Sequence, residues 1–190
     1  MTRTDAAFDF LATRASYPSK AMTGPAPDRA ALEPILAAAL RVPDHGNLQP
    51  WRLVVGGREA LSRWADLGEA RAREMGDDPV RIEKGRGQFD RSHLAVVVIA
   101  SPVPAEKVPE IEQTLSAGAL CLNLVNAATA AGWGAQWLTG WVAHDRAFIT
   151  RAFGCTVGEW VAGIVHIGTR GPAAAPDRPR PDLSRVVTWC

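Results

Sequence analysis

The sequence predicts one domain, residues 1–190, that contains both helices and β-strands. Residues 94–100 and 160–168 are apolar runs rich in valine and isoleucine, which is typical of strands covered on both faces. Residues 110–131 lie between them and are dense in alanine and leucine, which indicates a long helix buried within the domain or against another copy of the chain. A chain of 190 residues is long enough to enclose one real core, and no internal repeat is visible.

The first forty residues are expected to supply two helices. Residues 5–15 form a short first helix, which leads into a loop that contains several prolines. Residues 28–40 carry apolar side chains at helical spacing on one face, and Asp28 is a suitable N-cap. Pro34 conflicts with a helix that starts at Asp28, so the helix either kinks or starts near Glu33 with Pro34 at its first position.

The middle of the chain combines a short apolar strand with a long charged stretch. Residues 53–55 are expected to be a strand that Gly56 and Gly57 close. Residues 58–93 are expected to be helical, with a break near residues 76–79. Lysine and arginine number eight in this stretch, and aspartate and glutamate also number eight. Because the charges cancel, we expect a solvated face or lid and not a site for a polyanion.

The last third of the chain is expected to end in an arm. Residues 135–138 are expected to form a short strand, and residues 144–153 a helix that Gly154 stops. Residues 171–182 are a proline-rich spacer that cannot fold alone, and residues 186–189 are β-prone. A terminal strand behind an extended spacer is suited to reaching another subunit.

Composition excludes several classes of partner. The formal net charge is +1, which indicates neither a nucleic-acid nor a membrane partner. The three cysteines, Cys121, Cys155 and Cys190, are widely spaced and odd in number, which argues against a disulfide framework and favours a cytoplasmic location. No signal peptide is visible, and the most apolar segment, residues 117–131, is short for a membrane span and contains asparagine and threonine.

Common catalytic motifs are missing from the sequence. It has no GxSxG, Walker loop or HExxH, and its four histidines have no metal-ligand spacing. Gly132 and Gly134 follow a helix and precede a strand, which is the reverse of the order in a Rossmann phosphate loop. Trp133, Trp137 and Trp141 are core or interface aromatics, or they line a pocket for a flat ligand.

Two polar segments are candidate ligand sites. Residues 41–51 hold two prolines and a glycine among polar side chains, which predicts a stiff loop that either contacts a ligand or simply connects a helix to a strand. Arg14 and Ser16 offer a fork of donors and a hydroxyl, which suits a phosphate. The alternative for Arg14 is a C-terminal helix arginine that meets the helix dipole.

The order and spacing of several short motifs resemble the flavin-dependent nitroreductase family, in particular its short, minimal bacterial subgroup. The likeness covers nearly the whole chain. The motifs are Arg14-Ala15-Ser16, Arg41-Val42-Pro43-Asp44-His45-Gly46 followed by Gln49-Pro50-Trp51, Ser116-Ala117-Gly118, Trp137-Leu138-Thr139-Gly140, Phe153-Gly154-Cys155 and Ile167-Gly168-Thr169.

The resemblance implies an α+β fold with a mixed sheet between helices. It also implies a homodimer with two FMN molecules at the interface and a C-terminal strand that joins the partner's sheet. The FMN contacts that it implies are Arg14, Ala15, Ser16, Trp137, Leu138 and Thr139 from one subunit, and Arg41 and His45 from the other. The segment that it implies for NAD(P) is Ala127, Ala128, Thr129, Ala130, Ala131 and Gly132.

The implied activity is carried by the flavin, with no catalytic side chain and no metal. NADH or NADPH would pass hydride to flavin N5 and leave, and a nitroaromatic, quinone or similar flat acceptor would then be reduced in a ping-pong scheme. The alternatives are another flavin reaction, such as reductive dehalogenation or flavin destruction, and a non-catalytic flavin-binding dimer. The chain departs from the family pattern at Ala15 and Leu138, where arginines are expected, and both changes remove positive charge near the implied site.

Overall fold

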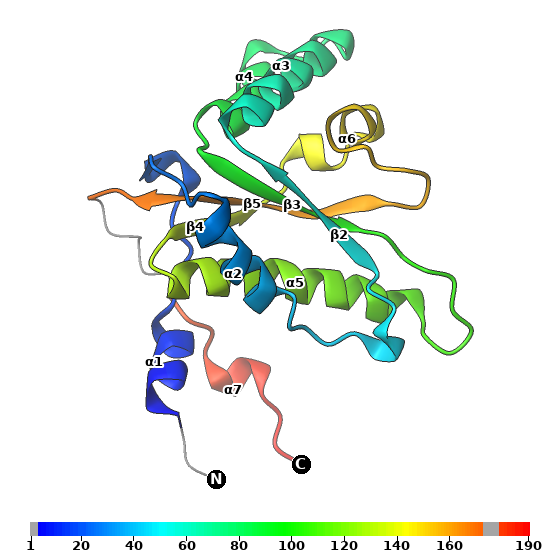
Figure 1. Ribbon diagram of the computed structural model, residues 1–190. Helices are drawn as coiled ribbons and strands as arrows, with labels where there is room; N and C mark the ends of the chain where they lie inside the picture. The colour runs from blue at the N-terminus through cyan, green and yellow to red at the C-terminus, as the bar shows by residue number, and fades with distance from the viewer. Residues whose placement is uncertain (1–3, 173–178) are drawn as a thin grey trace.

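Helices cover both faces of a β-sheet in the computed structural model, which describes residues 4–172 and 179–190 (Figure 1). The strands are β1 Met22–Thr23, β2 Trp51–Gly56, β3 Leu94–Ala100, β4 Gly134–Leu138 and β5 Trp160–Arg170. The helices are α1 Asp5–Thr13, α2 Arg29–Ala39, α3 Arg58–Glu74, α4 Pro79–Asp90, α5 Glu110–Ala130, α6 Arg146–Phe153 and α7 Leu183–Val186. Short 3₁₀ turns are η1 Ser19–Ala21, η2 His45–Asn47 and η3 Trp141–Ala143.

The sheet is centred on β3 and β5. Its order is β1-β5-β3-β2, with β4 also paired to β5. The register places Val97 of β3 opposite Val54 of β2 on one side and Ile164 of β5 on the other. All pairings among the described residues are antiparallel, so the parallel pairing of a mixed sheet would have to come from a strand beyond these. The predicted α+β class is confirmed.

Strand β3 is apolar throughout because both of its faces are buried. Val96 and Val98 point into a cluster with Leu120 and Leu124 of α5, while Val97 and Ile99 point into a second cluster on the opposite face. The first cluster also includes α2, and the second is formed with α3, α4 and α6. Each of these strand side chains is fully buried, as the continuous apolar run predicted.

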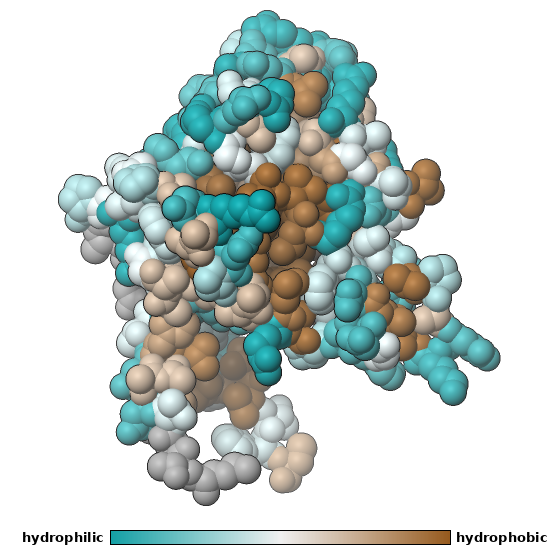
Figure 2. Space-filling model, in the orientation of Figure 1, coloured by the Kyte–Doolittle hydropathy of each residue, from teal (hydrophilic) through white to brown (hydrophobic). Residues whose placement is uncertain are grey.

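Helix α5 buries one face in the domain and leaves another uncovered. Leu120 and Leu124 are fully buried, but Ile111, Leu115 and Leu122 are 62%, 65% and 46% exposed. Nothing lies within 4 Å of a Cβ placed on Gly118, on the same outer side. Figure 2 shows hydrophobic side chains at the surface in the middle of the face that carries α5. An uncovered apolar stripe on a long helix is typical of a surface that another protein covers.

Three expected elements differ from the structure. Helix α2 begins after Asp28, whose carboxylate accepts the N–H of Ala31, and it continues through Pro34, so a start near Glu33 is wrong. Strand β2 begins at Trp51, two residues before the predicted start. Residues 186–189 form no strand in the single chain, because a strand needs a neighbour to accept its hydrogen bonds; α7 occupies residues 183–186 instead. Part of the predicted spacer, residues 173–178, lies outside the described residues.

Candidate functional site

The segment after α1 runs beside strand β4. Helix α1 ends at Thr13, and Arg14 takes extended backbone angles, so the predicted helical end at residue 15 is two residues too long. The N–H of Tyr17 donates to the carbonyl of Ala135 at 2.9 Å, and the N–H of Ser19 donates to Oε1 of Gln136 at 2.6 Å. These bonds bring residues 14–16 next to the outer edge of β4, although more than 100 residues separate the two segments.

A cavity of about 290 Å³ lies where these segments meet, and we call it the Arg14 cavity. Its lining residues are Arg14, Ala15, Ser16, Pro18, Gln136, Trp137 and Arg180. The guanidinium of Arg14 makes one long hydrogen bond, from Nη1 to Oδ1 of Asn126 at 3.4 Å, and its Nε is buried without a partner. The structure therefore brings together four of the predicted FMN contacts around a guanidinium that has one long hydrogen bond and one buried donor without a partner.

Trp137 forms a flat wall of this cavity because Gly163 lies beneath it. The indole Nε1 donates to the carbonyl of Ala162 at 3.1 Å, and the side chain is 39% exposed. A Cβ on Gly163 would lie 2.1 Å from that Nε1 and 2.9 Å from Sγ of Cys121. The missing side chain at residue 163 thus fixes how closely the indole approaches β5. Burial raises the pKa of Cys121 to about 12, so its thiol stays protonated and is not a nucleophile.

A second cavity, of about 400 Å³, adjoins the first one, and we call it the cationic cavity. The two share Pro18 and Gln136. The other residues that line the cationic cavity are Ser19, Lys20, Lys84, Gly85, Gly87, Gln88, Arg91, Leu138, Gly140, Trp141 and Val142. The predicted contact Leu138 lies here, and the carbonyl of Thr139 accepts a 3.5 Å hydrogen bond from Nε2 of Gln88. Sequence reasoning missed the contribution of α4, since only the fold brings it beside β4.

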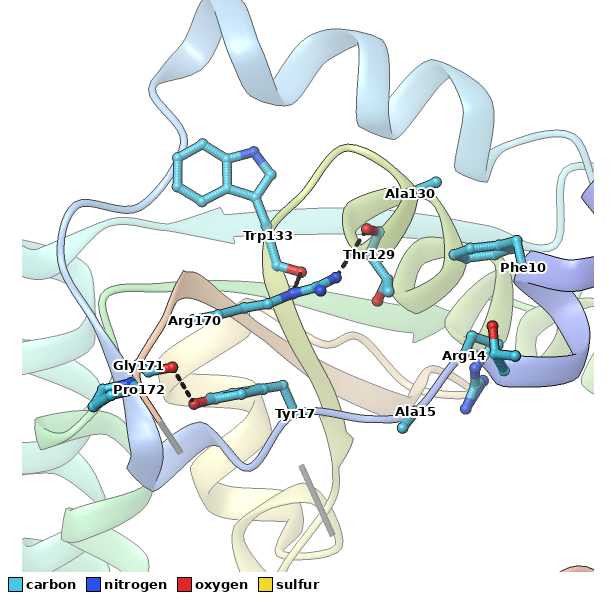
Figure 3. Close-up of a pocket in the computed structure, with 11 residues that line it drawn as sticks. Phe10, Arg14, Ala15, Tyr17, Thr129, Ala130, Trp133, Arg170, Gly171 and Pro172 are labelled. Atoms are coloured by element: carbon cyan, nitrogen blue, oxygen red, sulfur yellow. Dashed lines mark hydrogen bonds between the residues drawn. The ribbon is translucent and has the colours of Figure 1, made fainter. Parts of the chain in front are cut away.

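A larger cavity, of about 540 Å³, lies between α1 and the C-terminal end of α5 (Figure 3). Thr129 and Ala130 of the predicted NAD(P) segment line it, whereas Ala128 is fully buried and Ala131 and Gly132 are exposed. Arg170 donates to the carbonyl oxygens of Thr129 and Trp133 at 3.0 and 3.1 Å. The carbonyl of Thr129 belongs to the negative end of the α5 dipole, which disfavours a phosphate close to it.

Residues 41–50 form a loop that contains the 3₁₀ turn η2, as the two prolines predicted. Gly46, Asn47 and Gln49 all have positive φ angles, of 75°, 53° and 49°. The carboxylate of Asp44 accepts the N–H groups of Leu48 and Gln49 at 3.1 and 2.9 Å. This strained conformation costs free energy, and such conformations often accompany functional sites.

His45 lies far from the Arg14 cavity within one chain, whereas the carbonyl of Arg41 accepts a hydrogen bond from Asn123, one helical turn before Asn126. His45 pairs with Glu112 at 2.6 Å near the start of α5, and Arg41 is exposed. Arg14 contacts Asn126, which is 14 residues further along the same helix, or about 21 Å away at 1.5 Å per residue. A single chain therefore keeps His45 apart from the Arg14 cavity.

The Phe153-Gly154-Cys155 segment has a structural role in this chain. Arg52 of β2 donates to both carboxylate oxygens of Glu159 at 2.7 and 2.9 Å and to the carbonyl of Gly154 at 3.0 Å. This guanidinium lowers the pKa of Glu159 to about 2. The ion pair fastens the turn between α6 and β5 to the edge of the sheet.

Two further findings concern metal ligands and membrane-spanning helices in the part of the chain that the structure describes. No group of three or more histidine, cysteine, aspartate or glutamate side chains is placed to hold a metal ion. Within residues 4–172 and 179–190, none of the helices has the length and apolar character to cross a bilayer.

Comparisons with known proteins converge on one family. The nitroreductase family model matches residues 12–169. YdjA of Escherichia coli strain K12, provisionally named an NAD(P)H nitroreductase, is 32% identical over 183 residues, which are 96% of this chain and 98% of YdjA. A Haemophilus influenzae protein with the same provisional designation is 36% identical over 165 residues, 86% of this chain and 88% of that protein.

Solved structures agree with this fold. A nitroreductase-like protein from Bacillus cereus superposes with a TM-score of 0.81 at 22% identity, over 100% of this chain and 98% of that one. A provisionally named nitroreductase from Desulfovibrio desulfuricans, solved in complex with FMN, gives a TM-score of 0.73 at 19% identity, also over 100% and 98%. At these identities the structures establish the shared fold.

Proposed function

Because the chain belongs to the nitroreductase family, we propose that it is an FMN-dependent oxidoreductase that uses NADH or NADPH as electron donor. The observation that carries the proposal is the Arg14 cavity. It combines Arg14 and Ser16 with an aromatic wall at Trp137, and the buried Nε of Arg14 lacks a partner. YdjA bears an NAD(P)H nitroreductase designation and the Desulfovibrio neighbour was solved with FMN, which supports these two cofactors here.

The residues of the two adjoining cavities fit FMN chemically. A phosphate is best bound by guanidinium and hydroxyl donors, which Arg14, Ser16 and Arg180 supply in the Arg14 cavity. A flat ring needs an apolar wall, which Trp137 supplies in the Arg14 cavity and Leu138 supplies in the cationic cavity. FMN would thus extend from the Arg14 cavity toward the cationic cavity across Pro18 and Gln136, which line both.

FMN, when bound, supplies the hydride chemistry between NAD(P)H and a flat acceptor such as a nitroaromatic or a quinone. The chain itself would bind and orient the cofactor. The guanidinium of Arg14 would neutralise phosphate charge, and Trp137, held by Gly163 and the Ala162 carbonyl, would fix the plane of the ring. Because FMN would supply the hydride chemistry, the chain would need no activated nucleophile, which agrees with the absence of nucleophile motifs from the sequence.

The uncovered stripe on α5 supports a homodimer. Two α5 helices packed antiparallel about a two-fold axis near residue 119 would place residue 112 of one chain opposite residue 126 of the other. His45, which pairs with Glu112, would then approach the Arg14 cavity of the partner, which opens beside Asn126. The small residues Gly118 and Ala119 at the crossing would allow the helices to approach closely. This arrangement would bring His45 and the Arg14 cavity, which one chain keeps apart, into one site.

The C-terminal arm, residues 171–190, would complete the dimer. Val186 and Trp189 are 64% and 92% exposed in the single chain, and α7 buries no residue. We propose that residues 186–189 form their strand only on the partner's sheet, where strand β2 has no neighbour on its outer side among the described residues. Such a strand would satisfy backbone groups that the single chain leaves open.

Titration of the purified protein with FMN tests the proposal. We expect a yellow, saturable complex and steady oxidation of NAD(P)H that accelerates when a nitroaromatic is added. Arg14→Gln and His45→Ala should each weaken FMN binding about tenfold or more, since each removes a polar contact to the cofactor. Arg63→Gln is the control, because Arg63 lies on α3, pairs with Glu59 and lines neither cavity. A protein that neither binds FMN nor is stabilised by it would end the proposal.

A further inference from the structure

The positive charges of the α3–α4 region divide into two groups. Six arginines each make an ion pair with a carboxylate: Arg58, Arg63, Arg71, Arg73, Arg81 and Arg86. Lys84 and Arg91 make none with any described residue, and both line the cationic cavity. Lys20 lines the same cavity from the segment after α1 and is likewise without a carboxylate partner among residues 4–172 and 179–190. No acidic side chain of the described residues lines this cavity.

Helix α4 presents these charges on one face, and a glycine makes room for one of them. Residues 84, 87, 88 and 91 follow helical spacing and all line the cavity. A Cβ on Gly87 would lie 2.4 Å from Nη1 and 2.6 Å from Nη2 of Arg91. The guanidinium therefore lies back along the helix over Gly87, in space that any other residue would take. Glycine inside a helix is unfavourable, so its presence here accompanies a specific placement of Arg91.

The cavity also has a flat apolar wall and a direct connection to the proposed FMN site. Trp141, Leu138 and Val142 line it, and the Nε1 of Trp141 is buried without a hydrogen-bond partner. Leu138 and Ala15 are the two positions where the family resemblance predicts arginine, so positive charge is missing from the strand and from the first segment. Lys20, Lys84 and Arg91 supply positive charge from other elements to the cavity that Leu138 lines.

We propose that Lys20, Lys84 and Arg91 form an anion-recognition cluster that holds the negatively charged end of a flat ligand at the proposed flavin site. This inference rests on the proposed function. The group that the cluster holds has two sources, which are the pyrimidine edge of FMN, whose carbonyl oxygens accept hydrogen bonds and which becomes negatively charged on reduction, and an acceptor substrate that carries a carboxylate. Both present oxygen acceptors on a planar ring, and the apolar wall beside three unpaired cations matches that chemistry.

The test compares Lys84→Gln, Arg91→Gln and the triple variant that adds Lys20→Gln with wild type. Arg63→Gln is the matched control, because Arg63 carries the same charge on neighbouring α3 but pairs with Glu59 and lines neither cavity. The first readouts are the dissociation constant of FMN and the midpoint potential of bound FMN. The second is the binding of 4-nitrobenzoate and of neutral 4-nitrobenzyl alcohol, followed by quenching of tryptophan fluorescence without added flavin.

Loss of FMN affinity by about tenfold or more in the triple variant, with a lower midpoint potential, identifies the flavin as the source. Unchanged FMN binding with loss of the preference for 4-nitrobenzoate over the neutral alcohol identifies the acceptor. If the triple variant matches Arg63→Gln in both readouts, the cluster does not recognise anions and the inference is wrong. A wild-type protein that does not bind FMN would instead end the proposed function, and the flavin-free measurement would still decide the role of the cluster.

Gly87→Ala provides a test that keeps every charge. The new methyl group would displace the flexible end of Arg91 and not the helix backbone, and alanine should raise the unfolding midpoint by about 2 °C. We expect a more stable protein with weaker anion binding. A variant that is more stable and binds anions as wild type does would show that the placement of Arg91 is unimportant.

Discussion

Acidification should destabilise the protein through one buried imidazole, His166 of β5. The side chain is fully buried, its Nδ1 lies 2.7 Å from Oγ of Ser92, and its Nε2 has no partner. Burial lowers the pKa of His166 from 6.5 to about 4, because the charged imidazolium would lose its hydration there. No described carboxylate forms an ion pair with it, so nothing offsets this penalty.

The sign and size of the effect follow from proton linkage. Between pH 6.5 and pH 4 the unfolded chain binds a proton at His166 that the folded chain does not, so the free energy of unfolding falls as pH falls through that window. With these two pKa values, the contribution changes by about 2 kcal/mol between pH 7 and pH 5. The pKa of Glu159 is about 2 in the folded state and near 4.5 in the unfolded chain. Both compared pH values, 7 and 5, lie above these pKa values, so Glu159 contributes little to the change.

Urea unfolding at pH 7 and pH 5 measures this change, with His166→Gln as the matched variant. The glutamine keeps a polar side chain beside Ser92 but does not titrate. Wild type should lose about 2 kcal/mol more than the variant over this range. Both proteins are compared at one concentration, so that any effect of subunit association is shared. Equal losses in the two proteins would falsify the argument, as would a wild-type unfolding free energy that does not change with pH.

Three other outcomes follow from the packing. Leu115→Glu places a charge in the uncovered stripe of α5 and should convert the proposed dimer to a monomer in analytical ultracentrifugation; a dimer that persists places the interface elsewhere. Gly163→Ala puts a methyl group 2.1 Å from Nε1 of Trp137, so the indole must move, and FMN affinity should fall about tenfold or more in a fluorescence titration; unchanged affinity removes Trp137 from the site. In the native protein a thiol reagent should label exposed Cys190 within minutes and leave buried Cys121, whose pKa is raised to about 12, unlabelled, which mass spectrometry of the peptides would confirm or contradict.

The sequence was sufficient for the elements whose signal is local. The valine run of β3 and the alanine-rich α5 were predicted nearly to the residue, because burial on both faces leaves a continuous apolar pattern. Pro34 misled the analysis of α2, since proline costs one backbone hydrogen bond but the buried side chains Leu32 and Ile35 keep the helix intact on either side. The terminal strand, residues 186–189, could not form alone, because β propensity acts only where a neighbouring strand exists.

The candidate site was only partly visible in the sequence. Arg14 and Trp137 were found because the motifs around them resemble a known family, and the fold does place them in one cavity. The cationic cavity was not predicted. The net charge of residues 58–93 is zero. A net charge does not reveal which basic residues lack a carboxylate partner, and in the structure these include Lys84 and Arg91. Their convergence with Lys20 depends on tertiary contacts between segments that are more than 60 residues apart.

The helices at the two ends of the described chain, α1 and α7, bury none of their side chains in the single chain. A nine-residue helix such as α1 is too short to persist in water by itself. In the proposed dimer, association of the subunits and the final folding of these ends should therefore be one thermodynamic event, with the sheet and α5 already in place. In a newly made protomer the sheet and α5 would be folded, whereas α1 and α7 would not. Dilution that separates the subunits would therefore unfold α1 and α7 before it unfolds the sheet.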